Sequence, residues 1–261
     1  AMGITGTEVS KGAAVMILTD DNFATIVKAV EYGRSIYHNL FNYVRFQMAQ
    51  LVAFIASYLL AAFFVVLGGT PFSPGVVLFL NFLITVPVAI ALGYDKPASD
   101  LMEHRPRPLK QPILTVAQWV RIIFIGILTA IIVIYLEAVY EAQGVALATT
   151  MGFVAFALLS ISMGISARSE TATAFNSDII HDRNQLLLYG LALVITVLST
   201  ELGFLQRNLG LTPLTRDQWL TCIGFAIVLL LVEEVIKFFL RRRQPAAPAE
   251  KAAALKPMPN A

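Results

Sequence analysis

The polar residues of this chain that could best do chemistry stand inside an apolar stretch. Asn81 and Thr85 lie four residues apart within residues 76–93, so on a helix they would share one face. Pro87 follows them, and because its ring displaces the carbonyl of Leu83, one backbone oxygen is expected to lose its helical partner. Amide, hydroxyl and carbonyl oxygens are ligands of hard cations. The same residues also fit a proline kink with locally satisfied polar groups, and both interpretations stay open.

Two weaker candidates lie in other apolar stretches. Gln50 belongs to the preceding stretch and Ser160 to a later one. Gln50 could line the same cavity as Asn81, or it could hydrogen-bond a neighbouring helix. Ser160 is small, as residues between packed membrane helices tend to be, and its hydroxyl is a further possible oxygen ligand. The candidates for a cation site are therefore Asn81 and Thr85, and Gln50 and Ser160 are weaker candidates.

Acidic residues in or beside the apolar stretches have simpler expected roles. Glu137 and Glu201 stand near the ends of their stretches, and we expect both to reach water. Glu233 lies about two turns inside Arg241, where an acid is costly unless it is paired. Lys237 follows Glu233 by four residues and is its expected partner. We therefore interpret the Glu233–Lys237 pair as structural.

Six long apolar stretches must position these residues. Each is long enough, at about 1.5 Å of helix rise per residue, to cross a hydrocarbon core about 30 Å thick. The composition agrees, because 57% of the residues are hydrophobic and only 14% are charged, against about a quarter in a soluble domain. The sequence thus predicts an all-α polytopic membrane protein. The stretches lie near residues 46–67, 76–93, 120–140, 145–165, 186–205 and 219–240.

The basic residues are distributed unevenly between the two sides of this arrangement. If the N-terminal segment lies in the cytoplasm, only Arg207 and Arg216 among the 19 Lys and Arg residues fall on the outer side. With six crossings, this bias predicts that both termini lie in the cytoplasm, and we expect a multi-pass protein of the plasma membrane. The lipid bilayer is the expected partner, and a cation is the partner that the polar residues fit. A net charge of +2 is too small to suggest a nucleic acid partner.

The residues before the first stretch have a mixed pattern. The apolar run Ala14–Thr19, bounded by acids, predicts a buried strand. The polar residues 20–22 can cap a helix that starts near Phe23, and no strong breaker separates that helix from the first stretch. One helix, or two nearly continuous ones, should run from the cytoplasm into the membrane. Because one strand and one helix cannot bury a core alone, a segment before Ala1 is expected to complete this domain.

Several segments carry a family resemblance: Ala1–Lys11 (AMGITGTEVSK), Met16–Val27 (MILTDDNFATIV), Ala29–Asn39 (AVEYGRSIYHN), Leu92–Pro97 (LGYDKP) and Ser166–Glu170 (SARSE). In these residues the chain resembles the C-terminal part of cation-transporting P-type ATPases, closest to the branch of calcium, sodium/potassium and proton pumps. The motif match before the first apolar stretch is long and specific. The resemblance covers essentially the whole chain except the tail.

This resemblance implies a domain organisation. Residues 1–38 would be the truncated end of a cytoplasmic α/β phosphorylation domain with a haloacid dehalogenase-like fold. Residues 39–243 would be the family's fifth to tenth membrane helices, and the tail 244–261, rich in Ala and Pro, is expected to be disordered. ATP and magnesium would serve the full-length pump in phosphoryl transfer to an aspartate. The family's phosphorylated aspartate and nucleotide-binding residues are absent from this sequence, so we assign no catalytic or cofactor-binding residue.

The resemblance also bears on the ion. It places the cation site in the second apolar stretch, with Asn81 on a ligand asparagine of the family. This sequence departs from the calcium-pump pattern at the other ligand positions, because none of them holds a carboxylate and calcium sites usually use several. The ion therefore stays open. Those positions are occupied here by Leu51, Phe54, Ile84, Thr85 and Ser160.

The leading hypothesis is thus the membrane-transport portion of an ATP-driven cation pump, which would not be catalytically complete by itself. A degenerate P-type ATPase, or one that moves another kind of solute, is an alternative because of the lost acids. A secondary transporter or channel-like protein with six spans is a third hypothesis. The N-terminal motif segments argue against that third hypothesis.

Overall fold

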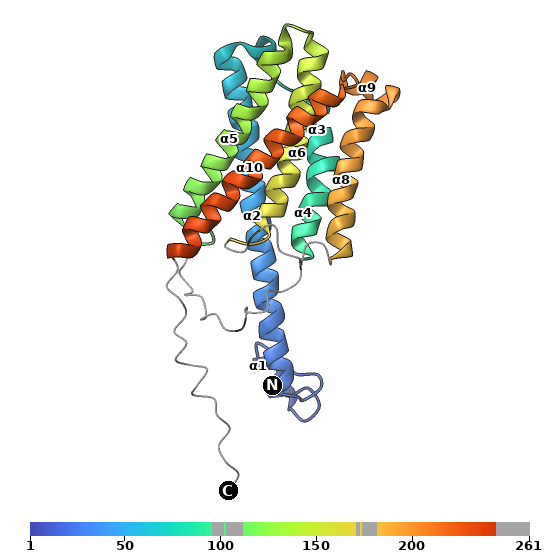
Figure 1. The fold of residues 1–261 in the computed structure, drawn as a ribbon. Helices are drawn as coiled ribbons and strands as arrows, with labels where there is room; N and C mark the ends of the chain where they lie inside the picture. The colour runs from blue at the N-terminus through green and yellow to red at the C-terminus, as the bar shows by residue number, and fades with distance from the viewer. Residues whose placement is uncertain (96–101, 103–111, 171–172, 174–181, 244–261) are drawn as a thin grey trace.

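The computed structural model describes residues 1–95, 102, 112–170, 173 and 182–243. Regular structure in that part of the chain is helical (Figure 1). The predicted disordered tail 244–261 lies outside the described residues. The elements are α1 (Glu8–Ala13), α2 (Ala24–Phe64), η1 (Val66–Gly69), α3 (Pro74–Phe79), η2 (Leu80–Thr85), α4 (Val86–Gly93), α5 (Val116–Glu141), α6 (Val145–Ala167), α8 (Arg183–Glu201), α9 (Gly203–Leu209) and α10 (Arg216–Arg243).

Five helical segments of the described chain are long and apolar enough to cross a membrane. They are α2, the continuous segment Pro74–Gly93 formed by α3, η2 and α4, and the helices α5, α6 and α8. Five of the predicted stretches are thereby confirmed. The fifth stretch ends earlier than predicted, because Leu202 leaves the helical conformation (φ −83°, ψ 113°) before α9 begins. The sixth stretch lies in α10, a helix of 28 residues that is not among the five, so its crossing stays a prediction.

Helix α2 is a single rod of 41 residues. At about 1.5 Å per residue it is about 60 Å long, which is twice the thickness of a hydrocarbon core. Its first half extends beyond the helical bundle to α1 and the N-terminus (Figure 1). Asn22 stabilises its start, since its side-chain oxygen accepts a hydrogen bond from the Ala24 amide at 2.9 Å. The expected helix from the N-terminal segment into the first apolar stretch is confirmed as one continuous helix.

The strand predicted at Ala14–Thr19 is wrong. Among the described residues, this segment forms only an isolated parallel bridge between Met2 and Leu18. Leu18 is buried, but Val15, Met16 and Ile17 are exposed. A strand needs a neighbour along its length, and here the only paired segment is the short stretch at residues 1–3. The described residues accordingly show no α/β domain.

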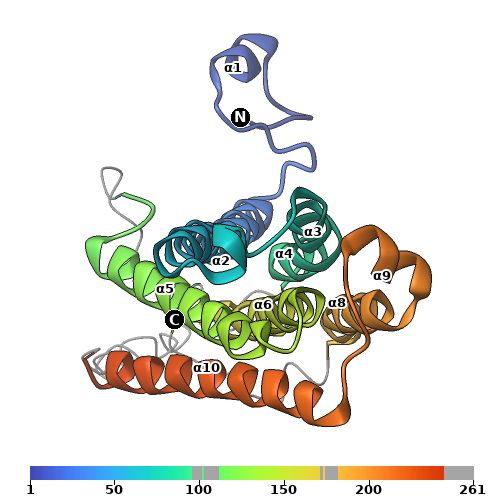
Figure 2. The same cartoon turned by 90° about the horizontal axis from the view of Figure 1, so that it is seen from above.

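Helix α6 occupies the centre of the bundle. It contacts α2, α4, α5, α8 and α10, and Figure 2 shows it between α5 and α8, with α10 on one side and α2 and α4 on the other. Its sequence contains no charged residue, so it can be buried on all sides at little cost. We call the end of the bundle from which α2 extends to α1 the inner end, and the opposite end the outer end.

Glycines allow close approach at several helix crossings. A Cβ added at Gly126 of α5 would lie 2.6 Å from Cγ1 of Val52 and 2.9 Å from the backbone oxygen of Ala49, both on α2. A backbone atom cannot move aside as the end of a flexible side chain can. Any larger residue at position 126 must therefore push α2 and α5 apart. Small residues at such crossings are typical of packed membrane helices.

We predict that Gly126→Ala lowers the free energy of unfolding by about 1–3 kcal/mol, because overpacking strains a filled crossing. Thermal unfolding in one detergent, followed by tryptophan fluorescence, measures the change. Gly190→Ala in α8 is the matched control, since nothing lies within 4 Å of its added Cβ. Equal unfolding temperatures for the Gly126→Ala protein and the wild type would contradict the close approach of α2 and α5.

Candidate cation site

The predicted ligand residues lie on three helices that contact one another. Phe54 of α2 packs on Phe156 of α6, with ring centroids 4.2 Å apart. Gln50 lies one turn from Phe54 toward the inner end, and Ser160 lies one turn from Phe156 in the same direction, because α2 and α6 run antiparallel (Figure 1). Gln50 and Ser160 therefore lie at the same depth.

Thr85 lies at this depth as well. A Cβ added at Gly164 of α6 would lie 2.1 Å from Cγ1 of Val88, so these two residues are in contact across the parallel helices α4 and α6. Thr85 and Ser160 each precede this contact by about one turn. Asn81 lies about one turn further toward the outer end, on the same Pro74–Gly93 segment. The fold thus gathers the four predicted residues around one level of α2, α4 and α6.

Two of these residues are buried and have no hydrogen-bond partner within the part of the chain that the structure describes. Gln50 is 1% exposed, and neither its amide oxygen nor its amide nitrogen is hydrogen-bonded there. Thr85 is 3% exposed, and its hydroxyl is also without a partner. Each such group costs about 1–3 kcal/mol when it is left unsatisfied, so each calls for an explanation such as a missing ion or water.

The other two residues are satisfied within their own helices. Ser160 is fully buried and donates its hydroxyl to the Phe156 carbonyl at 2.6 Å. Asn81 is half-buried, and its amide nitrogen donates to the Val77 carbonyl at 2.9 Å. The amide oxygen of Asn81 and the acceptor capacity of the Ser160 hydroxyl remain available to a cation.

The helix around Asn81 and Thr85 is locally widened. Leu80–Thr85 form a π-helical turn, and the Val86 amide donates to the Asn81 carbonyl, five residues back. Pro87 follows this turn and has no N–H to donate. Asn81 and Thr85 both lie within this turn, and their expected common face stays a prediction. Such turns occur frequently at functional sites.

The four candidate ligand side chains carry no charge. Gln50, Asn81, Thr85 and Ser160 are all neutral, and the described residues contain no group of three or more His, Cys, Asp or Glu side chains that could hold a metal ion. An ion bound here would meet oxygen dipoles, not carboxylates. The arrangement can replace part of a hydration shell without neutralising the charge.

The acids differ from the sequence expectation in two places. Glu201 is exposed, as expected, but Glu137 is fully buried, and its expected contact with water is wrong because Gly152 of α6 packs directly against its carboxyl group. No pattern within α5 reveals this contact.

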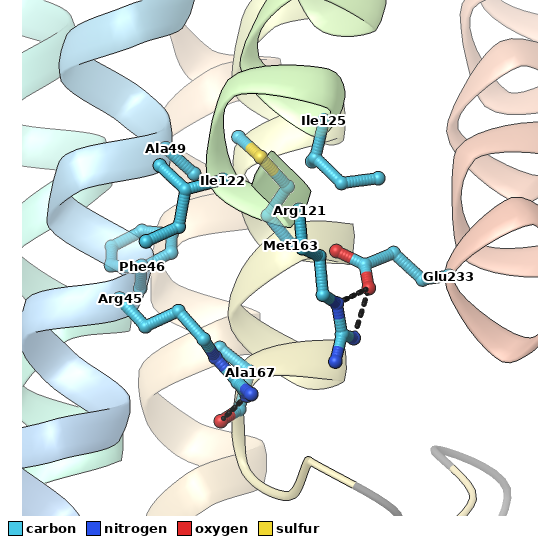
Figure 3. Close-up of a pocket in the computed structure, with 9 residues that line it drawn as sticks. All are labelled: Arg45, Phe46, Ala49, Arg121, Ile122, Ile125, Met163, Ala167 and Glu233. Atoms are coloured by element: carbon cyan, nitrogen blue, oxygen red, sulfur yellow. Dashed lines mark hydrogen bonds and ion pairs between the residues drawn. The ribbon is translucent and has the colours of Figure 1, made fainter. Parts of the chain in front are cut away.

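The expected Glu233–Lys237 pairing is also wrong. Glu233 pairs with Arg121 of α5, whereas Lys237 forms an ion pair with Glu234 at 3.3 Å. Figure 3 shows Arg121 reaching across to Glu233. Spacing along one helix predicted a local pair, but the partner of Glu233 comes from another helix.

Donors on α2 bind the carbonyl groups at the inner ends of α4 and α6. Asn39 donates to the carbonyls of Gly93 and Asp95, at 3.1 and 2.8 Å. Asn42 donates to the Arg168 carbonyl at 2.7 Å, and Arg45 donates to the Ala167 carbonyl at the same distance. The last contact is drawn in Figure 3. The carbonyls at the end of a helix have no partner within it, so these bonds attach both helices to α2.

A carboxylate–guanidinium pair links the same two helix ends. Arg168 donates from Nε and Nη2 to the two carboxylate oxygens of Asp95, at 2.9 and 2.7 Å. The pair is mostly shielded from water, with exposed side-chain fractions of 14% and 9%. Paired and shielded in this way, it is expected to stabilise the arrangement more than a surface pair does.

We predict a coupling free energy of about 1–3 kcal/mol between Asp95 and Arg168 in a double-mutant cycle with Asp95→Ala and Arg168→Ala. The free energies of unfolding of the wild type, both single variants and the double variant supply the measurement. The Glu8–Lys11 pair is the control, because Glu8 is 88% exposed and such pairs couple by less than about 1 kcal/mol. Equal coupling energies for the two pairs would show that shielding adds nothing at the inner end.

Comparison with known proteins finds several relatives that are named calcium-transporting ATPases. Calcium-transporting ATPase 1 of Schizosaccharomyces pombe is 31% identical over 245 residues, covering 93% of this chain and 27% of the relative. Calcium-transporting ATPase 1 of Bacillus cereus is 32% identical over 257 residues, with coverages of 91% and 28%. The human calcium-transporting ATPase type 2C member 2 is 30% identical over 247 residues, with coverages of 91% and 25%. The chain thus spans about a quarter of the length of these relatives.

A family model described as cation transporting ATPase, C-terminus, matches residues 69–239. The match begins in the turn after α2 and continues into α10, so it includes the π-helical turn, α6 and the inner-end carbonyls of α4 and α6. With its membrane-spanning helices and its relatives, the chain is a multi-pass membrane protein that belongs to the cation-transporting P-type ATPases, of which it forms the C-terminal membrane region.

Proposed function

We propose that this chain carries the cation-binding membrane region of an ATP-driven pump, with the ion bound between α2, the Pro74–Gly93 segment and α6. The observation that carries the proposal is the pair of buried, unpartnered side chains Gln50 and Thr85 at one depth of the bundle. Asn81 supplies a third side-chain oxygen from the π-helical turn, and Ser160 is a weaker fourth ligand.

Calcium is the first ion to test, because the relatives are named for calcium transport. Calcium sites use six to eight oxygens and usually carboxylates. The four candidate side chains are neutral and too few for that, so further oxygens and charge must come from backbone carbonyls and from the rest of the pump. We propose that the site is shared between this chain and other parts of the full-length protein.

We further propose that α10 is a sixth membrane crossing, so that the inner end and both termini lie in the cytoplasm. At about 1.5 Å per residue its 28 residues are long enough to cross. Only Arg207 and Arg216 among the 19 basic residues would then lie outside. The plasma membrane is the proposed location, as the printed names of some relatives include it.

Residues 1–38 are proposed to form the end of an α/β phosphorylation domain of the full-length pump. Their surface supports this, because many apolar side chains on it are exposed and would be buried against further structure. ATP and magnesium would act on that domain, and the α2 rod would transmit its movement into the membrane. The exposed apolar side chains include Ile4, Val9, Val15, Phe23, Val27, Val30 and Ile36.

We predict that Thr85→Val and Asn81→Ala raise the cation concentration for half-maximal ATPase activity of the full-length pump about tenfold each. The loss of one ligand contact of about 1.4 kcal/mol corresponds to that factor. ATP hydrolysis in lipid, titrated separately with Ca²⁺, Mn²⁺, Na⁺ and K⁺, identifies the ion and measures the shift. Asn208→Ala is the control, because Asn208 is exposed at the outer end and donates to the Phe204 carbonyl.

Unchanged half-maximal concentrations in both variants would remove this site from the transport path. If none of the cations stimulates the wild type, the alternative of a degenerate or non-metal-transporting P-type ATPase is supported.

We predict opposite signs for stability and cation affinity at Gln50. Gln50→Leu removes two unsatisfied buried polar atoms, so without added cation the thermal unfolding temperature should be unchanged or higher. The same change removes a ligand and should reduce the stabilisation that a saturating cation gives to the wild type. Unfolding scans with and without the stimulating cation test both parts. A Gln50→Leu protein with lower stability and undiminished stabilisation by the cation would show that Gln50 has a packing role.

A further inference from the structure

Glu137 is a buried acid that the proposed cation site does not use. It lies in the last turns of α5, its side chain is fully buried, and neither carboxylate oxygen has a hydrogen-bond partner in the described part of the chain. A Cβ added at Gly152 of α6 would lie 2.1 Å from its Oε1, so the backbone of α6 covers the carboxyl group. This geometry excludes water from at least one side of the acid.

Among the described residues, no positively charged side chain compensates Glu137. Titratable groups near it include Tyr58 of α2, Glu141 of α5 and Cys222 of α10, which contacts the Met151 carbonyl of α6. Tyr58 donates its hydroxyl to the Phe72 carbonyl and is not a donor to Glu137. An ionised carboxylate with neither water nor a cation would cost several kcal/mol, whereas a protonated carboxyl group is neutral.

A proton fits this place better than a metal ion. A metal ion needs several oxygen ligands at once, and the described residues place no second acid directly against the Glu137 carboxyl group. A proton needs only one oxygen. The carboxyl group of Glu137 is thus suited to hold one proton inside the protein.

Glu141 connects Glu137 with the outer end. It lies four residues further along α5, on the same helix face and about 6 Å along the axis. Its side chain is half-buried, and its Oε1 accepts a hydrogen bond from the Leu67 amide of η1 at 3.0 Å. Glu141 therefore lies between the buried acid and the outer turn, where water is available.

We propose that Glu137 is a proton-binding site that exchanges with the outer medium through Glu141. On release, the O–H bond of Glu137 breaks and the proton passes to a carboxylate oxygen of Glu141 or to a water beside it, and then to the outside. Uptake is the reverse. The direction of this exchange rests on the proposed function, because that proposal places the outer end outside the cell.

The first test detects the proton on the Glu137 carboxyl group directly. Infrared spectroscopy of the full-length protein in lipid at neutral pH should show the C=O band of a protonated carboxyl group, and Glu137→Gln should remove that band. Glu137→Asp should retain a band at a shifted position, and Glu201→Gln, which changes an exposed acid, should leave the spectrum unchanged. A wild-type spectrum without a band that depends on Glu137 would overturn the proposal.

The second test examines whether protons exchange between Glu137 and the outer medium through Glu141. In sealed vesicles, buffers of different pH on the outer side should shift the amplitude of the Glu137 band, and Glu141→Gln should slow that response. A response only to the inner buffer would overturn the outer path. Neither measurement requires cation transport. A pump that no cation stimulates would therefore count against the proposed function, whereas the presence or absence of the Glu137 C=O band would still decide whether Glu137 binds a proton.

Discussion

The attachment of α2 to the helical bundle depends on the carbonyl groups at the inner ends of α4 and α6, which need hydrogen-bond donors. The last carbonyl groups of α4 and α6 have no partners within their helices, and they lie at the edge of an apolar bundle where unsatisfied oxygens are costly. Asn39, Asn42 and Arg45 of α2 provide the missing donors. Arg45 also places a positive charge near the negative end of the α6 dipole. The bonds that satisfy these carbonyls thereby attach the long rod to the bundle.

This attachment has consequences for the cation site. Gln50 lies five residues beyond Arg45 on α2. Thr85 ends η2, which continues into α4, and Ser160 lies on α6, so both belong to segments whose inner ends α2 holds. Since α2 is helical without interruption from Ala24 to Phe64, a displacement of its free half must either break the inner-end bonds or carry those helix ends with it. The second outcome would move the proposed ligand oxygens on those helices. The inner-end bonds and the proposed cation site thus involve the same three helical segments.

Sequence reasoning succeeded where the determining interactions are local. Hydropathy predicted six spanning helices, of which five are confirmed, and the absence of breakers predicted one helix, or two nearly continuous ones, where α2 runs unbroken. It failed where distant segments decide the outcome. The apolar run at Ala14–Thr19 has no neighbouring strand with which to form a sheet, and Gly152 of α6 determines the burial of Glu137. Pro87 signalled an irregular helix, but not that a widened turn would include Asn81.

For the candidate site, too, the sequence indicated some properties and not others. Its residues could be named from the sequence, because they carry oxygen atoms within apolar stretches. Which of them lack partners could not, since Ser160 and Asn81 bond to carbonyls four residues back, while Gln50 and Thr85 do not. Helix geometry alone allows a hydroxyl such as that of Thr85 to bond backwards, but in the π-helical turn it does not.

A neutral site has an electrostatic consequence for the whole pump. Oxygen dipoles can replace water around a cation, but they do not cancel its charge, and an uncompensated charge in the membrane interior is expensive. Away from the inner end, Glu137 is the buried acid of the described spans. Gly126 of α5 contacts Ala49 and Val52 of α2, so it lies near the level of Gln50. Glu137 is more than two turns further along α5 than Gly126. It is too distant to be a ligand at that level. Glu233 is already paired with Arg121, so a cation at the proposed site would need further negative charge. This is the physical reason to propose that the site is shared with the rest of the protein.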